Sequence, residues 1–268
     1  MNYRQQAINL FVQKTKYTKE EIKSCIPIHN GFTNISYKIK LKNNTTYQVR
    51  IGNDHHQINR HNEQLIYRLI KFPYFIYYDV ETGNAIKKWI EGKNPSYRTI
   101  LSTKFLKSFA VSLKCIHKIK TNLIQKHDYF DCFKQAKLPL KHQNAYKILI
   151  KKYLKMPLVL SHNDLSADNL IYTHNGTVIF IDYEWARMNN QYWDIANFIR
   201  EVNLPLSKIK LLAQLMRIRN VKSLLTFVYL ATNYAYQWTF NMPYTKKIKS
   251  YRLVTFKKME YYYRFIQF

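Results

Sequence analysis

Glycine is scarce in this chain, with only five among 268 residues. Glycine-rich phosphate-binding loops need several closely spaced glycines, so such loops are nearly excluded. The three cysteines, Cys25, Cys115 and Cys132, are widely spaced and form no Cys-x-x-Cys pair. That spacing excludes the usual zinc and dithiol motifs and indicates reduced thiols, as in a cytoplasmic protein.

Acidic residues are also few, with 16 Asp and Glu against 43 Lys and Arg, so the net charge is +27. Such a charge attracts polyanions, including nucleic acid, ATP and anionic membranes. However, the basic residues are scattered along the whole chain, and neither a zinc-finger spacing nor an aromatic RNA-binding signature is present. We therefore expect no specific nucleic-acid partner.

Long apolar runs are missing as well. The N-terminus lacks the uninterrupted apolar core of a signal peptide. Residues 223–245 carry no charge, but Asn233, Gln237 and Asn241 interrupt them and Pro243 lies near their end. We expect a buried helix here and no transmembrane segment.

Strictly alternating apolar and polar residues predict two strands, at 35–42 and 45–51. In the second, the apolar face begins at Tyr47 and takes every other residue. Arg50 therefore points to the opposite face.

Helical spacing follows at 58–70 and leaves Glu63 off the apolar stripe. Two further strands are predicted at 74–80 and 85–90. Residues 91–95, Glu-Gly-Lys-Asn-Pro, break the pattern and suit a hinge between two lobes.

Beyond the hinge the sequence is mainly helical, with helices predicted at 101–119 and 143–154. The exception is a hairpin centred on Asn175-Gly176, because both residues tolerate positive φ. The hydrophobic content of 47% suffices for a packed core in each part.

The chemistry-bearing pattern is His162-x-Asp164 followed by Asn169, placed after an apolar run and before that hairpin, whose second strand ends on Asp182. Folding the hairpin back would bring Asp182 beside Asn169 and near Asp164. A carboxylate to receive a proton, with an amide and an acid to hold Mg²⁺, matches the needs of phosphoryl transfer from ATP. In the alternative interpretation, Asp164 and Asn169 only cap turns.

The segment HNDLSADNLIY…VIFIDYEWARMNNQYWDIANFIRE resembles the choline kinase family, within the aminoglycoside phosphotransferase-like and protein kinase-related superfamily. It is most similar to the shorter bacterial choline kinases. The resemblance implies an α+β, two-lobed protein kinase-like fold. Residues 1–92 would form a small β-rich nucleotide-binding lobe, and residues 93–268 a larger, mainly helical catalytic and substrate-binding lobe.

The resemblance also implies roles for the motif residues. Asp164 would be the catalytic base, Asn169 and Asp182 would ligate Mg²⁺, and His162 would support the loop. Arg50 matches the basic residue on the ATP phosphates and Glu63 its ion-pair partner. A solvated arginine on a strand face is the alternative for Arg50.

The segment 30–36, Asn-Gly-Phe-Thr-Asn-Ile-Ser, resembles the family's nucleotide-covering loop. Backbone amides and the side chains of Thr33, Asn34 and Ser36 would then approach a phosphate. A plain hairpin turn remains the alternative.

A quaternary ammonium cannot donate N–H hydrogen bonds, so a choline pocket needs aromatic faces and a carboxylate. Glu201 aligns with the family's pocket acid. Six aromatic residues are candidates for this pocket, with Trp238 the first choice, and they could equally be core residues: Trp185, Tyr192, Trp193, Tyr234, Tyr236 and Trp238.

The predicted function is ATP- and Mg²⁺-dependent phosphorylation of choline to phosphocholine. Ethanolamine, thiamine or an amino sugar are alternative substrates with the same machinery, whereas an aminoglycoside would favour more acids than the chain has. A basic, non-catalytic kinase-like binding protein is the alternative outside enzymology.

Overall fold

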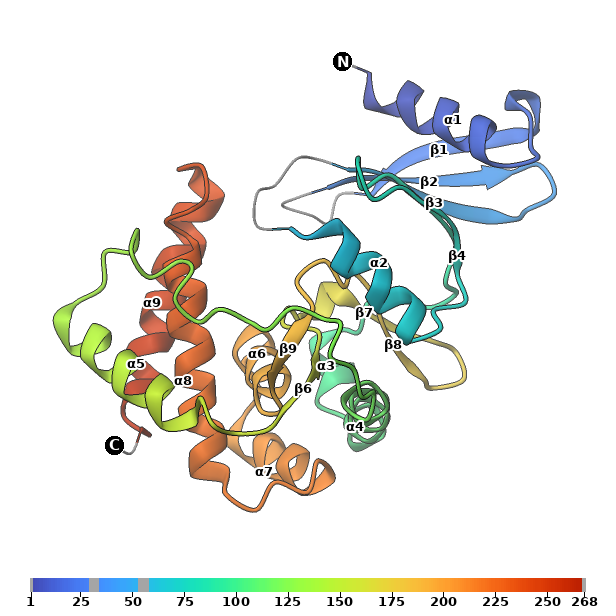
Figure 1. Cartoon of the computed structure of the whole chain (residues 1–268). Coiled ribbons are helices and arrows are strands. Elements are labelled where there is room, and N and C mark those ends of the chain that lie inside the picture. Colours follow the sequence, from blue (N-terminus) through green and yellow to red (C-terminus); the bar gives the residue numbers. More distant parts are fainter. Residues whose placement is uncertain (1, 29–33, 53–57, 267–268) are drawn as a thin grey trace. The chain divides into compact units, whose positions relative to one another are not determined.

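The computed structural model describes residues 2–28, 34–52 and 58–266. They form two compact units, shown in Figure 1 with colours that follow the sequence. One unit is Met1–Gly92 with Tyr183–Trp185, and the other is Lys93–Asp182 with Ala186–Phe268.

The first unit contains a five-stranded antiparallel sheet with the strand order β1-β2-β3-β5-β4. Among the described residues of this unit, the other regular elements are two α-helices and a short 3₁₀ turn, Lys19–Glu21. The elements are α1 (Tyr3–Lys14), β1 (Ile22–Ile28), β2 (Ile35–Leu41), β3 (Thr46–Ile51), α2 (Arg60–Leu69), β4 (Phe75–Tyr78) and β5 (Ala85–Lys88).

Apolar side chains at alternate positions of β3 contribute to the core of this unit. Tyr47 and Val49 are buried on one face, where α1 packs with Ala7 and Phe11. The rings of Phe11 and Tyr47 lie 5.1 Å apart, in the tilted arrangement that aromatic pairs favour. Figure 1 shows α1 lying along the sheet.

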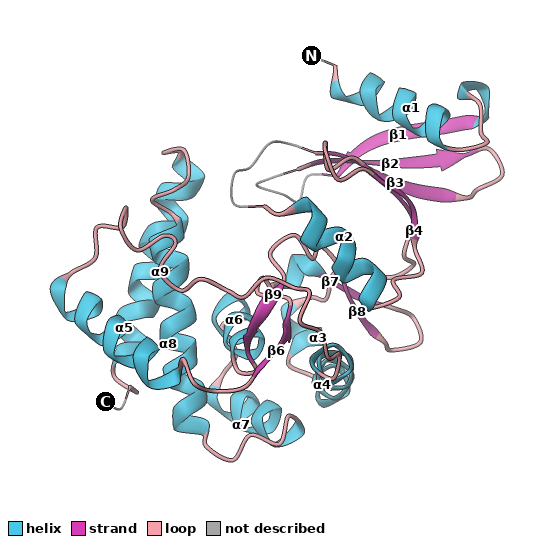
Figure 2. Cartoon of the chain, viewed as in Figure 1, coloured by secondary structure: helices cyan, strands magenta, loops and turns pink. Residues whose placement is uncertain are grey.

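The second unit is mainly helical, with two small antiparallel ribbons, β6 with β9 and β7 with β8 (Figure 2). The 3₁₀ turn Ala167–Asn169 immediately precedes β7. The elements are α3 (Tyr97–Ile100), α4 (Thr103–His117), α5 (Leu140–Tyr153), β6 (Leu158–Ser161), β7 (Leu170–Tyr172), β8 (Val178–Phe180), β9 (Arg187–Asn190), α6 (Trp193–Val202), α7 (Leu206–Leu215), α8 (Val221–Trp238) and α9 (Lys246–Tyr263).

Stacked aromatic rings join the helices of this unit. Phe109 of α4 stacks on Phe198 of α6 with their centroids 4.2 Å apart, and Phe105 stacks against both. The uncharged run at 223–245 forms most of α8, which is buried along most of its length. Of the described helices, none combines the length and apolarity needed to span a bilayer.

Most predicted elements are confirmed with shorter bounds, whereas the helix predicted at 143–154 begins earlier, at Leu140. The helix expected from residue 58 begins at Arg60, since the side chain of Asn59 accepts a hydrogen bond from the backbone of Asn62. Gly176 takes φ +84° in the turn of the predicted hairpin. Helix α1 and the strands β1 and β9 were not predicted.

Replacing Phe11 with Ala should destabilise the fold by about 3–5 kcal/mol, because its fully buried ring fills the space between α1 and the sheet. Chemical denaturation of the purified protein measures the change. Gln13→Ala, on an exposed position of the same helix, is the control and should change stability by less than about 0.5 kcal/mol. A Phe11→Ala effect as small as the control would show that α1 is not part of the core.

Candidate active site

The motif His162-x-Asp164 lies in a turn that leaves β6, and this turn is held through its backbone. The Asp194 carboxylate accepts hydrogen bonds from two successive amides, those of His162 at 3.0 Å and Asn163 at 2.8 Å. Asp194 lies in the first turn of α6 and is fully buried. Asn163 takes a left-handed φ of 64°, which asparagine tolerates better than most residues.

His162 supports this turn and does not point outward. Its Nε2 donates to the carbonyl of Ile181 at 2.9 Å, and the side chain is fully buried. His117 of α4 lies 2.9 Å from the same Asp194 carboxylate. These contacts suit a residue that supports the turn, which is the role that the resemblance implied for His162.

Asn169 lies directly beside Asp164. Its amide nitrogen donates to the Asp164 carbonyl at 2.7 Å and to the Asp164 carboxylate at 2.9 Å. Both hydrogens of the amide are therefore committed to Asp164. The Oδ1 oxygen of Asn169 is left as an acceptor, with no partner in the described part of the chain.

The hairpin β7–β8 brings the backbone next to Asp182 back to Asn169. The backbone N–H of Ile181, the preceding residue, donates to the carbonyl of Asn169 at 3.0 Å. Asp182 itself takes a φ of 67°. The ribbon thus brings the segment carrying Asp182 back to Asn169, as the hairpin signal in the sequence indicated.

The pKa of Asp164 is raised above its ordinary value, mainly by burial. Nearby His162 and Arg200 lower it, whereas the carboxylates of Glu201 and Asp182 raise it. Several charged groups of the second unit therefore lie close enough to Asp164 to change its pKa.

The donor set fits magnesium. Mg²⁺ is usually held by one or two protein oxygens together with waters and phosphate oxygens. Asn169 Oδ1 and the Asp182 carboxylate supply such oxygens. Among the described residues, no group of three or more His, Cys, Asp and Glu is arranged to hold a metal by itself, so nucleotide phosphates would have to complete the coordination.

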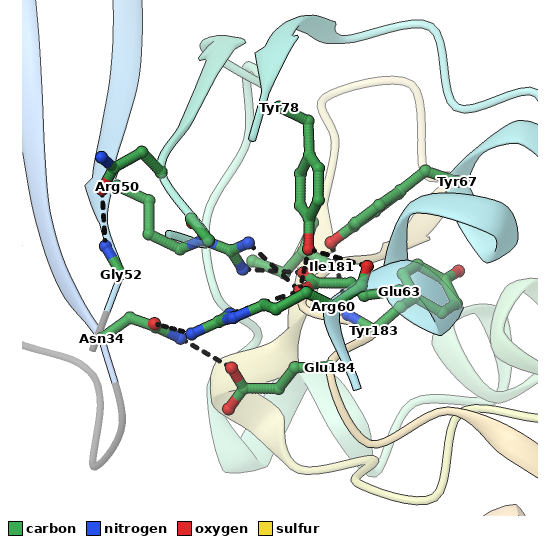
Figure 3. A network of polar contacts seen from close by, with 12 residues as sticks. Asn34, Arg50, Gly52, Arg60, Glu63, Tyr67, Tyr78, Ile181, Tyr183 and Glu184 are labelled. Atoms are coloured by element: carbon green, nitrogen blue, oxygen red, sulfur yellow. Dashed lines mark hydrogen bonds and ion pairs between the residues drawn. The ribbon is translucent and has the colours of Figure 1, made fainter. Parts of the chain in front are cut away.

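In the first unit, Arg50 and Glu63 form a buried, bidentate ion pair (Figure 3). Arg50 Nη1 and Nη2 donate to the two carboxylate oxygens at 2.7 and 3.1 Å, and Nε donates to the Gly83 carbonyl at 3.0 Å. The fork geometry of arginine matches a carboxylate in this way. The predicted pairing of these two side chains is present.

The sequence analysis missed two partners of Glu63. Tyr78 donates to it at 2.7 Å, and Arg60 Nη1 lies 3.4 Å from it. Arg60 also donates to Asn34 at 3.3 Å, and Asn34 donates to Glu184 at 2.6 Å (Figure 3). The three-residue spacing between Arg60 and Glu63 on one helix was a usable signal.

Thr33 and Ser36 were also predicted to line the nucleotide-covering loop. Thr33 lies outside the described residues. Ser36 Oγ accepts a hydrogen bond from Gln48 at 3.3 Å, within the sheet. Ser36 pairs directly with Arg50 across β2 and β3.

The carboxylate of Glu201, the predicted pocket acid, is hydrogen-bonded to other side chains of the second unit. Its Oε1 accepts hydrogen bonds from Arg200 and from the Tyr251 hydroxyl, the latter at 2.8 Å. Burial acts to raise the pKa of Glu201, but Arg200 and Tyr251 hold it below its ordinary value. The ring of Trp238 meets Tyr251 edge-on at 6.4 Å.

The other aromatic candidates fall into different surroundings. Trp193 is only 1% exposed and packs against Tyr129 at 5.2 Å and Tyr234 at 5.8 Å. The Tyr234 hydroxyl donates to both oxygens of Asp131, at 2.9 and 3.0 Å. Trp185 is half-buried and belongs to the first unit.

Sequence comparison connects this geometry with known proteins. The family described as choline/ethanolamine kinase matches residues 136–255. An uncharacterized protein of Mycoplasma pneumoniae, the MG356 homolog, is 36% identical over 263 residues, covering 96% of this chain and 92% of the relative. Residues 136–255 thus form a choline/ethanolamine kinase family domain, and the chain as a whole is a relative of the Mycoplasma pneumoniae protein. A shorter stretch of 50 residues is 52% identical to an ethanolamine kinase of Drosophila melanogaster, covering 18% of this chain and 10% of that enzyme.

Solved structures show the same fold. A choline kinase, LicA, from Streptococcus pneumoniae superposes with a TM-score of 0.76 at 20% identity over 93% of this chain and 98% of that one. An ethanolamine kinase from Plasmodium vivax gives a TM-score of 0.78 at 18% identity over 97% and 89%. The predicted protein kinase-like fold, with a β-sheet N-terminal region and a helical C-terminal part, is confirmed.

Removing the charge of Glu63 should cost stability in a pH-dependent way. Burial acts to raise the pKa of Glu63, but Arg50, Tyr78 and Arg60 together lower it. A lowered pKa contributes stability above the ordinary value of about 4.3 that is lost as pH falls through the folded value. Glu63→Gln should therefore destabilise the protein by about 3–5 kcal/mol at pH 7 and by less toward pH 3.

Denaturation curves recorded between pH 7 and pH 3 measure this difference. Glu81→Gln, at an exposed turn position, is the control and should show a small effect at every pH. An equal cost for Glu63→Gln across the range would contradict the ion-pair assignment.

Proposed function

We propose that the chain catalyses ATP- and Mg²⁺-dependent phosphorylation of a small cationic alcohol, with choline as the first candidate substrate and ethanolamine as the second. The match of residues 136–255 to the choline/ethanolamine kinase family supports a small-alcohol kinase. The observation that carries the proposal is the amide of Asn169 hydrogen-bonded to the carboxylate of Asp164 in a turn fixed by Asp194.

Asp164 is the proposed base. Its carboxylate would orient the substrate hydroxyl and receive its proton, a positioned transfer worth about 10²–10⁴ in rate. Asn169 donates one hydrogen bond to the Asp164 backbone carbonyl and one to the Asp164 carboxylate, and together these restrict rotation of the carboxylate before substrate arrives. Such preorganisation avoids reordering in the transition state.

Asn169 Oδ1 and Asp182 are the proposed metal ligands. Bound Mg²⁺ would offset the negative charge on the transferring phosphoryl group. Asp182 approaches from the hairpin and Asn169 from the 3₁₀ turn, and the Ile181–Asn169 backbone hydrogen bond fixes their registry. A one-residue slip of the ribbon would turn Asp182 away.

In the first unit, Arg50 is the proposed phosphate ligand and Glu63 its support. Each Nη nitrogen of Arg50 carries a second N–H besides the one directed at Glu63. Asn34, tied to Arg60 and Glu184, and Ser36, which pairs with Arg50, are proposed to lie along the nucleotide-covering segment.

The substrate cation is proposed to bind near Glu201. The Tyr251 hydroxyl contacts this acid, and Trp238 contacts the Tyr251 ring. Aromatic rings beside a carboxylate suit a quaternary ammonium at about 0.5–2 kcal/mol per contact. The 52% identity to an ethanolamine kinase over 50 residues favours ethanolamine as the second candidate.

The first test uses purified protein, ATP, Mg²⁺ and a panel of alcohols, namely choline, ethanolamine, thiamine and an amino sugar. Formation of ADP together with phosphocholine or phosphoethanolamine is expected. Asp164→Asn should lower kcat by at least about 10²-fold, because the amide cannot accept the proton. Asp168→Asn, an exposed acid in the same segment, should retain nearly full activity.

Two outcomes would count against the proposal. Turnover of Asp164→Asn close to that of the unmodified chain would refute the assigned base. Absence of any phosphorylated alcohol, combined with tight RNA binding at physiological salt, would instead favour the non-catalytic basic binding protein.

A further inference from the structure

The carboxylate of Glu201 forms an ion pair with Arg200 through one of its two oxygens. Arg200 Nη1 donates to Glu201 Oε1 and to the Tyr251 hydroxyl, the latter at 3.0 Å, and Tyr251 donates to the same Oε1. Oε1 of Glu201 thus accepts two hydrogen bonds. Oε2 of Glu201 has no partner in the described part of the chain and is the oxygen left for a ligand.

The other end of the Arg200 guanidinium leads to the catalytic turn. Its Nε donates to Asn197 Oδ1 at 2.9 Å, and Asn197 Nδ2 donates to the carbonyl of Asn163 at 2.7 Å. Asn163 immediately precedes Asp164. A continuous chain of hydrogen bonds therefore runs from the proposed cation-binding acid to the residue beside the proposed base.

Both ends of this chain are fixed. Asn163 is also held through its amide by Asp194 and through its side chain by Asn189, at 2.8 and 2.7 Å. At the Arg200 end, Lys258 of α9 donates to the Arg200 carbonyl at 2.5 Å. Arg200 is 8% exposed, so its guanidinium has little freedom to leave these partners.

We propose that Arg200 is a positioning residue that couples Glu201 to the turn bearing Asp164, and so fixes where the ammonium and the hydroxyl of one substrate molecule lie. The proposal rests on the function proposed above. Glu201 Oε2 takes the ammonium, and Asp164 takes the hydroxyl of the same short alcohol. Arg200 sets the geometry between them without contacting the substrate.

Arginine suits this role because its guanidinium donates in two directions at once. Nε serves the catalytic turn and Nη1 serves the acid. A lysine has one ammonium at the end of a flexible stem and reaches only one of the two partners. Removing either end of the chain should therefore affect a different kinetic parameter.

The test measures kcat and the KM for the alcohol and for ATP in four variants, using the better substrate of choline and ethanolamine. Tyr251→Phe loosens only the Glu201 end, and Asn197→Ala only the catalytic turn. Arg200→Met removes both connections, and Arg200→Lys retains charge without the fork. Arg219→Met and Tyr261→Phe, at exposed positions, are the matched controls.

Tyr251→Phe should raise the KM for the alcohol about fivefold or more with kcat nearly unchanged. Asn197→Ala should lower kcat about tenfold or more with a nearly unchanged KM for the alcohol. Arg200→Met should do both, and Arg200→Lys should restore the KM but not kcat. The KM for ATP should stay within about twofold throughout. In the Asn197→Ala background, Arg200→Met should cause little further loss of kcat.

Thermal unfolding identifies any variant that does not fold. If Arg200→Met fails to fold, the contrast between Tyr251→Phe and Asn197→Ala decides the question. Parallel changes of kcat and the KM for the alcohol in these two variants, or a silent Arg200→Met, would overturn the coupling role. An unmodified chain that phosphorylates neither alcohol would refute the proposed function itself, which separates the two failures.

Discussion

One buried carboxylate organises the proposed chemistry. Asp194 accepts hydrogen bonds from the backbone amides of His162 and Asn163 and lies beside His117. Two successive amides that donate to the two oxygens of one carboxylate fix the direction of the chain where it leaves β6, and Asp164 comes next. A buried charge is costly unless its hydrogen bonds are satisfied, so the turn and the carboxylate stabilise each other. The positions of Asn169 and of the hairpin that carries Asp182 follow from this turn.

Helix α6 extends the same arrangement toward the proposed substrate. Asp194, Asn197 and Glu201 are three and four residues apart, so they lie along one side of the helix. The helix therefore carries in series the acid that holds the turn, the amide that contacts Asn163 and the acid proposed for the cation. In the first unit a comparable buried pair, Arg50 with Glu63, is stabilised by Tyr78 and Arg60. In each place a buried carboxylate, Asp194 or Glu63, accepts hydrogen bonds at both of its oxygens.

Patterns of local origin were predictable from the sequence. The strands around Arg50, the helix carrying Glu63, and the Asn175-Gly176 hairpin each have a short-range signal. Helix α1 was missed because only Ala7 and Phe11 are buried along it, too few for a clear stripe. Strand β9, Arg-Met-Asn-Asn, was missed because its pairing with β6 is imposed by tertiary structure. Tyr251 was missed because its contacts with Arg200 and Glu201 join α9 to α6, and nothing local indicates such a pairing. Arg200 is the neighbour of Glu201 in the sequence, but its arrangement also depends on this tertiary contact with Tyr251.

The most direct test of this account is the kcat of Asp194→Asn with ATP, Mg²⁺ and the preferred alcohol. The substitution keeps the shape of the side chain but replaces one acceptor oxygen with a donor that faces a backbone N–H. The account predicts that kcat falls by about 10²-fold or more while the protein remains folded and the KM for ATP changes little. A folded variant with kcat within about threefold of the unmodified chain would contradict the claim that this carboxylate sets the catalytic geometry.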